Sequence, residues 1–155
     1  MTTLPIVGDI TPLATGVKRG QLKRMSSDFS GYGCLAVTIW LTSGEGFRLT
    51  SSMHDLTDGI EVGILKLELL LHPQPDEASV DLPWSFRNGG SIAKLVIEQR
   101  GIRAESGLLL RSRDGEEIII VPATSPHRLY VEGVDSLAGQ AMPEYSLSRY
   151  LQEPI

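Results

Sequence analysis

The segment SSMHDLTDG, residues 51–59, carries the residues best suited to chemistry, a histidine followed closely by two acids. A histidine whose ring is oriented by a carboxylate can act as a general base. On a helix, the neighbours His54 and Asp55 point about 100° apart, whereas His54 and Asp58 share one face. His54 with Asp58 is therefore the candidate catalytic pair, which would suit a His/Asp-dependent hydrolase.

The same segment also has a purely structural interpretation, which we favour. Ser52 and Asp55 have the spacing of a capping box, and Gly59 stands where a helix would end in a left-handed residue. The spacing therefore predicts a short helix over residues 53–58, with the polar side chains in capping positions.

The histidines are also the candidate ligands of a metal site. His54, His72 and His127 have no ligand spacing such as H-x-x-x-H, so they could bind an ion only if the fold brings them together. We find no phosphate-binding loop and no dinucleotide fingerprint. We therefore expect neither a metal nor an organic cofactor.

Large aromatic side chains are candidates for binding. Trp84 and Phe86 lie in the segment LPWSF, where they either cap the core or project as an interaction hot spot. Trp40 and Tyr130, together with Trp84, could instead line the pocket of a ligand-binding β-barrel. These four residues are our candidates for a partner- or ligand-binding site.

Composition and charge limit the class of partner. The chain has 155 residues, 41% of them hydrophobic and 21% charged, which is typical of one globular domain spanning residues 1–155. The net charge of −5 disfavours nucleic acid and anionic membranes as partners, although residues 17–25 form one basic patch, VKRGQLKRM. We expect another protein as the partner.

The location of the protein is inferred from its cysteine and its termini. Cys34 is the only cysteine, so no intramolecular disulfide can form, and the N-terminal residues do not resemble a signal peptide. These features are typical of a cytoplasmic protein, in a bacterial style.

Two hairpins are predicted from alternating apolar runs and turn residues. In CLAVTIWLTSGEGFRLT, a three-residue loop over residues 43–45 would place Leu41 opposite Phe47. In GLLLRSRDGEEIIIV, a two-residue Asp114-Gly115 turn would pair Arg113 with Glu116. Because both strands of the second hairpin are apolar on both faces at their base, a sandwich or barrel is favoured over a single open sheet.

Other segments add strands and one further helix. The apolar phase flips within residues 60–71, which predicts either a β-bulge or a strand buried on both faces. Residues 92–99 fit a strand better than a helix, and residues 127–133 predict another strand. The C-terminal run PEYSLSRYLQEPI predicts one or two helical turns that would place Leu147, Tyr150 and Leu151 together.

These patterns lead to one expected fold and three possible functions. The fold is mainly β, an antiparallel sandwich or open barrel with one or two short helices. The preferred function is a non-enzymatic interaction or accessory domain of the regulatory or immunity type, with a homodimer possible. The alternatives are a small-ligand-binding β-barrel and a His/Asp-dependent hydrolase or metal enzyme.

Overall fold

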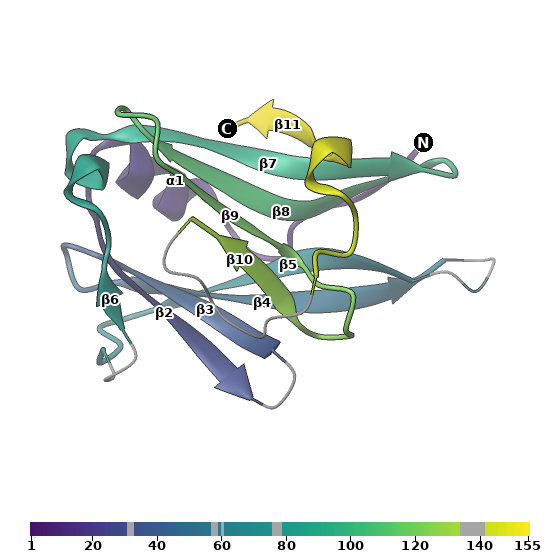
Figure 1. Cartoon of the computed structure of the whole chain (residues 1–155), viewed down its shortest axis with the longest axis horizontal. Coiled ribbons are helices and arrows are strands. Elements are labelled where there is room, and N and C mark those ends of the chain that lie inside the picture. The colour runs from purple at the N-terminus through teal and green to yellow at the C-terminus, as the bar shows by residue number, and fades with distance from the viewer. Residues whose placement is uncertain (31–32, 57–58, 60, 76–78, 134–141) are drawn as a thin grey trace.

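The strands fold into two facing layers in the computed structural model (Figure 1). The structure describes residues 1–30, 33–56, 59, 61–75, 79–133 and 142–155. One layer contains, in order of pairing, β6 (Val80–Asp81), β2 (Leu22–Ser30), β3 (Gly33–Leu41), β4 (Gly46–Asp55) and β5 (Glu61–Leu70). The other contains β11 (Leu151–Pro154), β7 (Gly90–Gln99), β8 (Ile102–Ser112), β9 (Glu117–Pro122) and β10 (Leu129–Glu132). Neighbouring strands within each layer are antiparallel, so the predicted fold class is confirmed.

The two layers are connected along both sides. On one side, β10 pairs with the start of β3 through Leu129 and Cys34. On the other side, the N-terminal segment, residues 2–7, bridges the layers: β1 (Thr2–Leu4) pairs in parallel with β8, and Val7 pairs with β5. The result is a sandwich made from one sheet that folds over on itself.

The main core fills the space between the layers. On β3, Val37 and Ile39 face inward, and Phe47 and Leu49 of β4 lie directly beside them. All four side chains are fully buried. The alternation read from the sequence therefore identifies the buried face of this hairpin correctly.

Helix α1 (Thr11–Lys18) closes one end of the main core with the buried side chains of Leu13 and Val17. We did not predict this helix, although Pro12 in its first turn and the spacing of Leu13 and Val17 are typical helix signals. None of the helices in the described ranges is long and apolar enough to cross a membrane.

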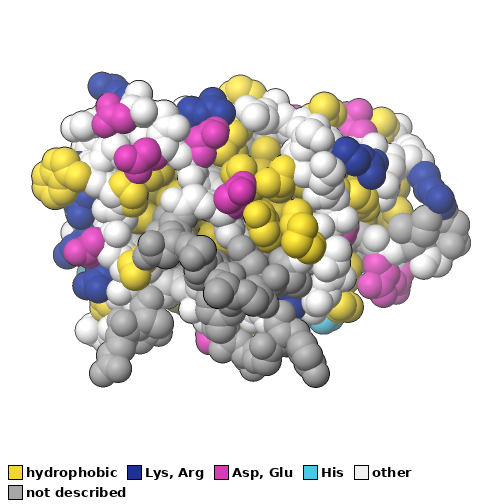
Figure 2. Space-filling model, in the orientation of Figure 1, with side chains coloured by type: hydrophobic (Ala, Val, Ile, Leu, Met, Phe, Trp, Pro, Cys, Tyr) yellow, Lys and Arg dark blue, Asp and Glu magenta, His cyan; other side chains and the backbone are white. Residues whose placement is uncertain are grey.

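A second apolar surface lies on the outer face of β7, β8 and β9. Its buried residues include Leu95, Leu109 and Val121, and the C-terminal residues Tyr145 and Tyr150 pack against it with their rings edge to face. Figure 2 shows hydrophobic side chains still in view on this face of the molecule. The C-terminal segment is thus a cover over a sheet that is apolar on both faces, as the second hairpin predicted.

Both hairpins differ from prediction in register. The loop between β3 and β4 has three residues, as predicted, but it spans residues 42–44, because the Leu41 N–H donates to the Glu45 carbonyl oxygen. Ile39 rather than Leu41 therefore lies opposite Phe47. The loop between β8 and β9 spans residues 113–115, because the Ser112 N–H donates to the Glu116 carbonyl oxygen. Gly115, with φ of 90°, completes this three-residue loop as a bulge of the kind that follows a type I turn. The predicted two-residue turn was wrong by one residue.

The predicted helix over residues 53–58 was also wrong within its described part. Residues through Asp55 belong to β4, and His54 lies opposite Val62 of β5. The pairing of β4 with the apolar strand β5 outweighs the local capping signal of Ser52 and Asp55, because tertiary contacts routinely override local helix propensity. Asp58 lies outside the described residues.

The remaining strand predictions are confirmed. Residues 92–99 lie in β7, and β10 falls within residues 127–133. β5 pairs with β4 without a bulge, and its first half is buried on both faces, which explains the phase flip. At the C-terminus, however, a short 3₁₀ turn, η2 (Leu147–Arg149), and β11 replace the predicted helix, leaving Tyr150 buried and Leu151 exposed.

Candidate functional site

The most prominent candidate on the surface is Trp84, which begins the 3₁₀ helix η1 (Trp84–Asn88). Trp84 is 77% exposed, whereas Phe86, two residues further on, is 2% exposed and belongs to the main core. The Phe86 N–H donates to the carbonyl oxygen of Pro83 over 3.1 Å. Phe86 therefore anchors the turn that presents Trp84 to solvent, so the two aromatic residues have opposite environments.

The surroundings of Trp84 are basic. The Arg87 guanidinium carbon lies 5.5 Å from the centroid of the Trp84 ring, a cation–π arrangement. At the end of η1, the backbone of Gly89 lies beside the side chain of Arg113. Figure 1 places η1 at one end of the molecule, and at this end Figure 2 shows hydrophobic side chains beside charged ones. An aromatic side chain with a cationic rim suits a partner surface that offers apolar contact and carboxylates.

The other two aromatic candidates lie elsewhere. Trp40 is 5% exposed, and its indole N–H donates to the Pro73 carbonyl oxygen over 2.8 Å. It lines a cavity of about 220 Å³ together with Lys23 and His72. Tyr130 packs half-buried on the outer face of the sheet, where burial and the charge of Glu132 raise the pKa of its hydroxyl. The structure thus does not gather Trp40, Trp84 and Tyr130 around one pocket.

The histidines also lie apart. His54 and His72 line two different cavities, and His127 is exposed between β9 and β10. Within the described ranges, no group of three or more histidine, cysteine, aspartate or glutamate side chains could hold a metal ion. Because neighbours on a strand point to opposite faces, Asp55 is not placed to orient the His54 ring.

The cavity beside His54 is the larger of the two, at about 340 Å³, and we call it the end cavity. It lies where β1, the end of β4 and the turn between β7 and β8 meet. It is lined by Thr2, Leu4, His54, Asp55, Leu56, Arg100 and Ile102. One end of the sandwich therefore offers a concave site with charged groups of both signs and an aliphatic wall.

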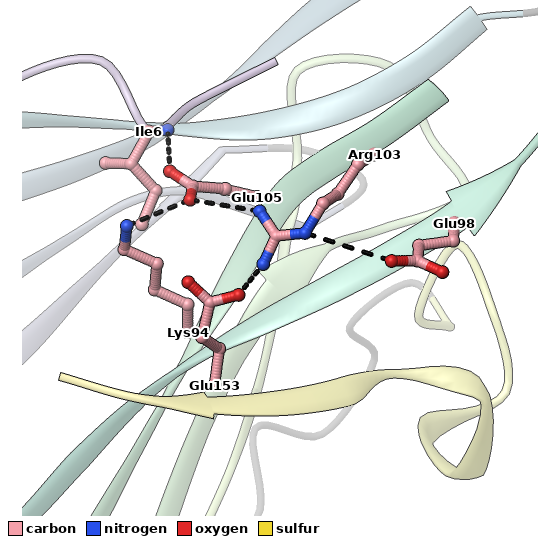
Figure 3. Close-up of polar contacts among 6 residues, drawn as sticks. All are labelled: Ile6, Lys94, Glu98, Arg103, Glu105 and Glu153. Carbon is pink, nitrogen blue, oxygen red and sulfur yellow. Dashed lines mark hydrogen bonds and ion pairs between the residues drawn. The ribbon is translucent and has the colours of Figure 1, made fainter. Parts of the chain in front are cut away.

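A buried ion network lies at the N-terminal segment (Figure 3). One carboxylate oxygen of Glu105 accepts the Ile6 N–H over 3.0 Å, and the other lies 2.9 Å from Lys94 Nζ and 3.5 Å from Arg103. Arg103 also pairs with Glu98 and with Glu153 of β11. The network thus ties residues 2–7 and the C-terminal strand to the sheet.

Opposing effects set the charge state of Glu105. Burial alone would raise the pKa of the carboxyl group. The hydrogen bonds from Lys94 and Ile6, with the positive charges of Lys94 and Arg103, outweigh burial and hold the pKa below its usual value. A carboxylate that is already fully paired is a structural element rather than a free base. We did not single it out, although Lys94 shares strand parity with the apolar Ile92 and Val96, which signals an inward-facing charge.

A second partly buried acid connects the C-terminal segment to β5. Both carboxylate oxygens of Glu144 lie 3.2 Å from the Gly63 N–H. Burial raises the pKa of Glu144, and the nearby charge of Glu61 adds to this effect, while hydrogen bonds from Gly63 and Tyr145 oppose it. The net shift of the pKa is upward, so the folded state disfavours the charged form of Glu144.

No protein-family model matches the chain, and no curated protein and no solved structure matches it significantly. The functional argument therefore depends on the geometry of the described residues.

Proposed function

We propose that this protein is a non-enzymatic interaction domain that binds another protein through a surface centred on Trp84. The exposure of Trp84 is the observation that carries the proposal. A large aromatic side chain left 77% exposed loses the burial that such residues usually gain on folding. Tryptophan is also the residue type most enriched among interface hot spots.

The way in which Trp84 is held supports the same proposal. Phe86 is fixed in the main core and η1 contacts β2 and β8, so Trp84 is presented by a short, anchored turn. A side chain that is already positioned loses less conformational entropy on binding than one on a free loop. The nearby Arg87 provides a rim charge for a partner with acidic groups around its apolar contact.

The proposed setting is the cytoplasm, in which the buried thiol of Cys34 would stay reduced. The partner would be a protein of the same compartment, with an accessory, regulatory or immunity role for this chain. A second copy of the chain is the simplest alternative partner, because Trp84 surfaces could meet about a two-fold axis.

The test compares Trp84→Ala with Leu71→Ala, a matched control because Leu71 is 73% exposed and follows β5, outside η1. Both variants and the wild type are used as immobilised bait, and self-association is followed by light scattering during gel filtration. We expect wild type and Leu71→Ala to retain the same bound protein or the same dimer, and Trp84→Ala to lose it. Retention of that protein or dimer by Trp84→Ala would overturn the proposal.

A further inference from the structure

We propose that the edge of β7 and the apolar face beside it form an acceptor site for an extended segment of a partner protein. Residues 142–155 of the chain itself, the C-terminal segment, occupy this site until the partner displaces them. The inference does not depend on the Trp84 surface, because no residue of η1 belongs to the apolar cluster that the C-terminal segment covers.

The face in question is the outer face of β7, β8 and β9. Leu95 and Ile97 of β7, Leu109 of β8 and Val121 of β9 form a buried apolar cluster here, to which the C-terminal segment adds Tyr150. Outward-facing positions of a sandwich are ordinarily polar, because the inner faces alone form the core. An apolar outer face needs a cover, and a contiguous apolar surface that can be uncovered is typical of an interaction site.

The edge of the sheet beside this face can accept a strand. Among the described strands, β11 alone pairs with the outer edge of β7, and Figure 1 shows it alongside β7. β7 has ten residues, whereas β11 pairs with four of them, Ala93 to Val96, and one further bond joins the Ile155 N–H to the Ile92 carbonyl oxygen. The backbone groups of a sheet edge are a template for another strand. A longer strand could therefore pair with more of β7 than the C-terminal segment does.

The C-terminal segment is held by few buried groups. Of residues 142–155, Tyr150 alone is buried, at 6% exposure, while Tyr145 and Leu147 pack half-buried beside it. All four residues of β11 are exposed. Regions with few buried apolar contacts open at a lower free energy than the core. The segment can therefore leave the sheet while the main core, which lies between the layers, stays closed.

The C-terminal segment is also a template for the chemistry of the partner. Its anchor is the aromatic ring of Tyr150, which packs in the same cluster as Leu95. Three positions later, Glu153 forms an ion pair with Arg103 of β8. A partner segment that satisfies the same groups is extended, runs antiparallel to β7, and carries an aromatic residue followed three positions later by an acid.

A partner protein fits this site better than a second copy of the chain. Exchange of C-terminal segments between two copies would replace every contact by an identical one, so it would gain no new interaction. The chain's own segment also has the advantage of a high effective concentration. A partner strand that pairs along more of β7 gains hydrogen bonds that β11 does not make, and it can displace the segment on that account.

The experiment measures binding of a fluorescent peptide, with the sequence of residues 142–155, to the whole chain by fluorescence anisotropy. Tyr150→Ala in the chain removes the anchor and should open the site. We expect it to bind the peptide at least about tenfold more tightly than wild type does, because apparent affinity scales with the open fraction. Leu151→Ala is the matched control, since Leu151 is the next residue and is 52% exposed, and it should bind the peptide as wild type does.

Hydrogen exchange shows that the variant opens the segment and leaves the fold intact. In Tyr150→Ala, exchange of the Ile155 amide, which bonds to β7, should accelerate. Exchange of the Leu41 amide, which bonds to Glu45 across the hairpin of β3 and β4, should stay as slow as in wild type. A peptide that itself carries Tyr150→Ala should not bind to either protein.

Two results would overturn the proposal. One is peptide binding by Tyr150→Ala that is absent or no tighter than in wild type, although the Ile155 amide exchanges faster. The other is a wild-type dimer that Tyr150→Ala abolishes and Trp84→Ala does not, because the occupant would then be a second copy. Trp84→Ala should leave peptide binding unchanged, so failure of this proposal and failure of the Trp84 proposal give different results.

Discussion

The Lys94 ammonium nitrogen lies 2.9 Å from Oε2 of Glu105, while the other carboxylate oxygen of Glu105 accepts the Ile6 N–H. One side chain thus neutralises a partly buried cation on the sheet and fixes the backbone of the N-terminal segment. Several expected outcomes depend on this arrangement and on its neighbours.

Replacing Glu105 with glutamine should destabilise the fold by about 1–3 kcal/mol, because Lys94 and Arg103 would lose their shared counter-ion in a partly buried setting. The free energy of unfolding, measured by urea denaturation, checks this. The control is Arg111→Gln, which removes an exposed ion pair with Glu117 and should cost less than about 1 kcal/mol. Equal losses in the two variants would contradict a special role for Glu105.

Glu105 should also make the fold sensitive to acid. Its pKa in the folded state lies below the ordinary value of 4.5, so below about pH 4.5 the unfolded chain binds more protons than the folded one. Stability should therefore fall as the pH drops from 4.5 through the lower folded pKa. Chemical denaturation across this range gives the free energy of unfolding at each pH. We expect this free energy to fall less steeply with decreasing pH in Glu105→Gln than in wild type. Equal slopes in the two proteins would argue against the pairing of Glu105 with Lys94 and Arg103.

Glu144 should act in the opposite direction. Its pKa is raised above 4.5 in the folded state, so the folded chain holds the extra proton in the interval between the two values. This contribution reduces stability as the pH rises from 4.5 through the folded pKa. Glu144→Gln keeps one oxygen to accept the Gly63 N–H and carries no charge, so its stability should exceed that of wild type most clearly near neutral pH. The free energy of unfolding of both proteins, measured by urea denaturation at several pH values, checks this. If the two differ by the same amount at every pH, titration of Glu144 is not the cause of the difference.

Two glycines with similar backbone angles should respond differently to alanine. A Cβ on Gly115 (φ 90°) would meet nothing within 4 Å, so Gly115→Ala should cost only the conformational strain, about 1–3 kcal/mol. A Cβ on Gly8 (φ 107°) would lie 2.1 Å from the Leu67 carbonyl oxygen, so Gly8→Ala should carry that strain and also push residues 2–7 away from β5.

Hydrogen exchange of the Val7 and Leu67 amides can separate these two effects. Both amides bond across the contact between the N-terminal segment and β5, so Gly8→Ala should accelerate their exchange far more than Gly115→Ala does. Similar exchange rates in the two variants would mean that the contact between the N-terminal segment and β5 does not depend on Gly8.

Strand identity could be predicted from the sequence because period-two alternation reflects which face is buried. Phe47 and Leu49, for example, share parity and lie together in the main core. Register could not be predicted as well, since it depends on the loop. The Asp114-Gly115 pair suits a two-residue turn, but burying Leu108 and Leu110 on the same face as Ile118 and Ile120 requires the three-residue loop.

The candidate sites show a similar division. His54 could be chosen from its type, but its role as a cavity residue depends on Thr2 and Arg100, which are far from it in sequence and close to it only through strand pairing. The sequence also does not predict that Trp84 is exposed while Phe86 is buried. Their spacing of two residues in LPWSF would place both on one face of a strand, whereas the structure has a 3₁₀ turn here that places them in different environments.

The bridge made by residues 2–7 has a consequence for the order of folding. These residues are synthesised well before β5 and β8, with which they pair, and the contact between Ile6 and Glu105 spans 99 positions of the chain. Closing so long a loop early would cost much entropy for few contacts. We therefore expect the N-terminal segment to stay unpaired while the hairpins form and to dock late, when it connects the two layers.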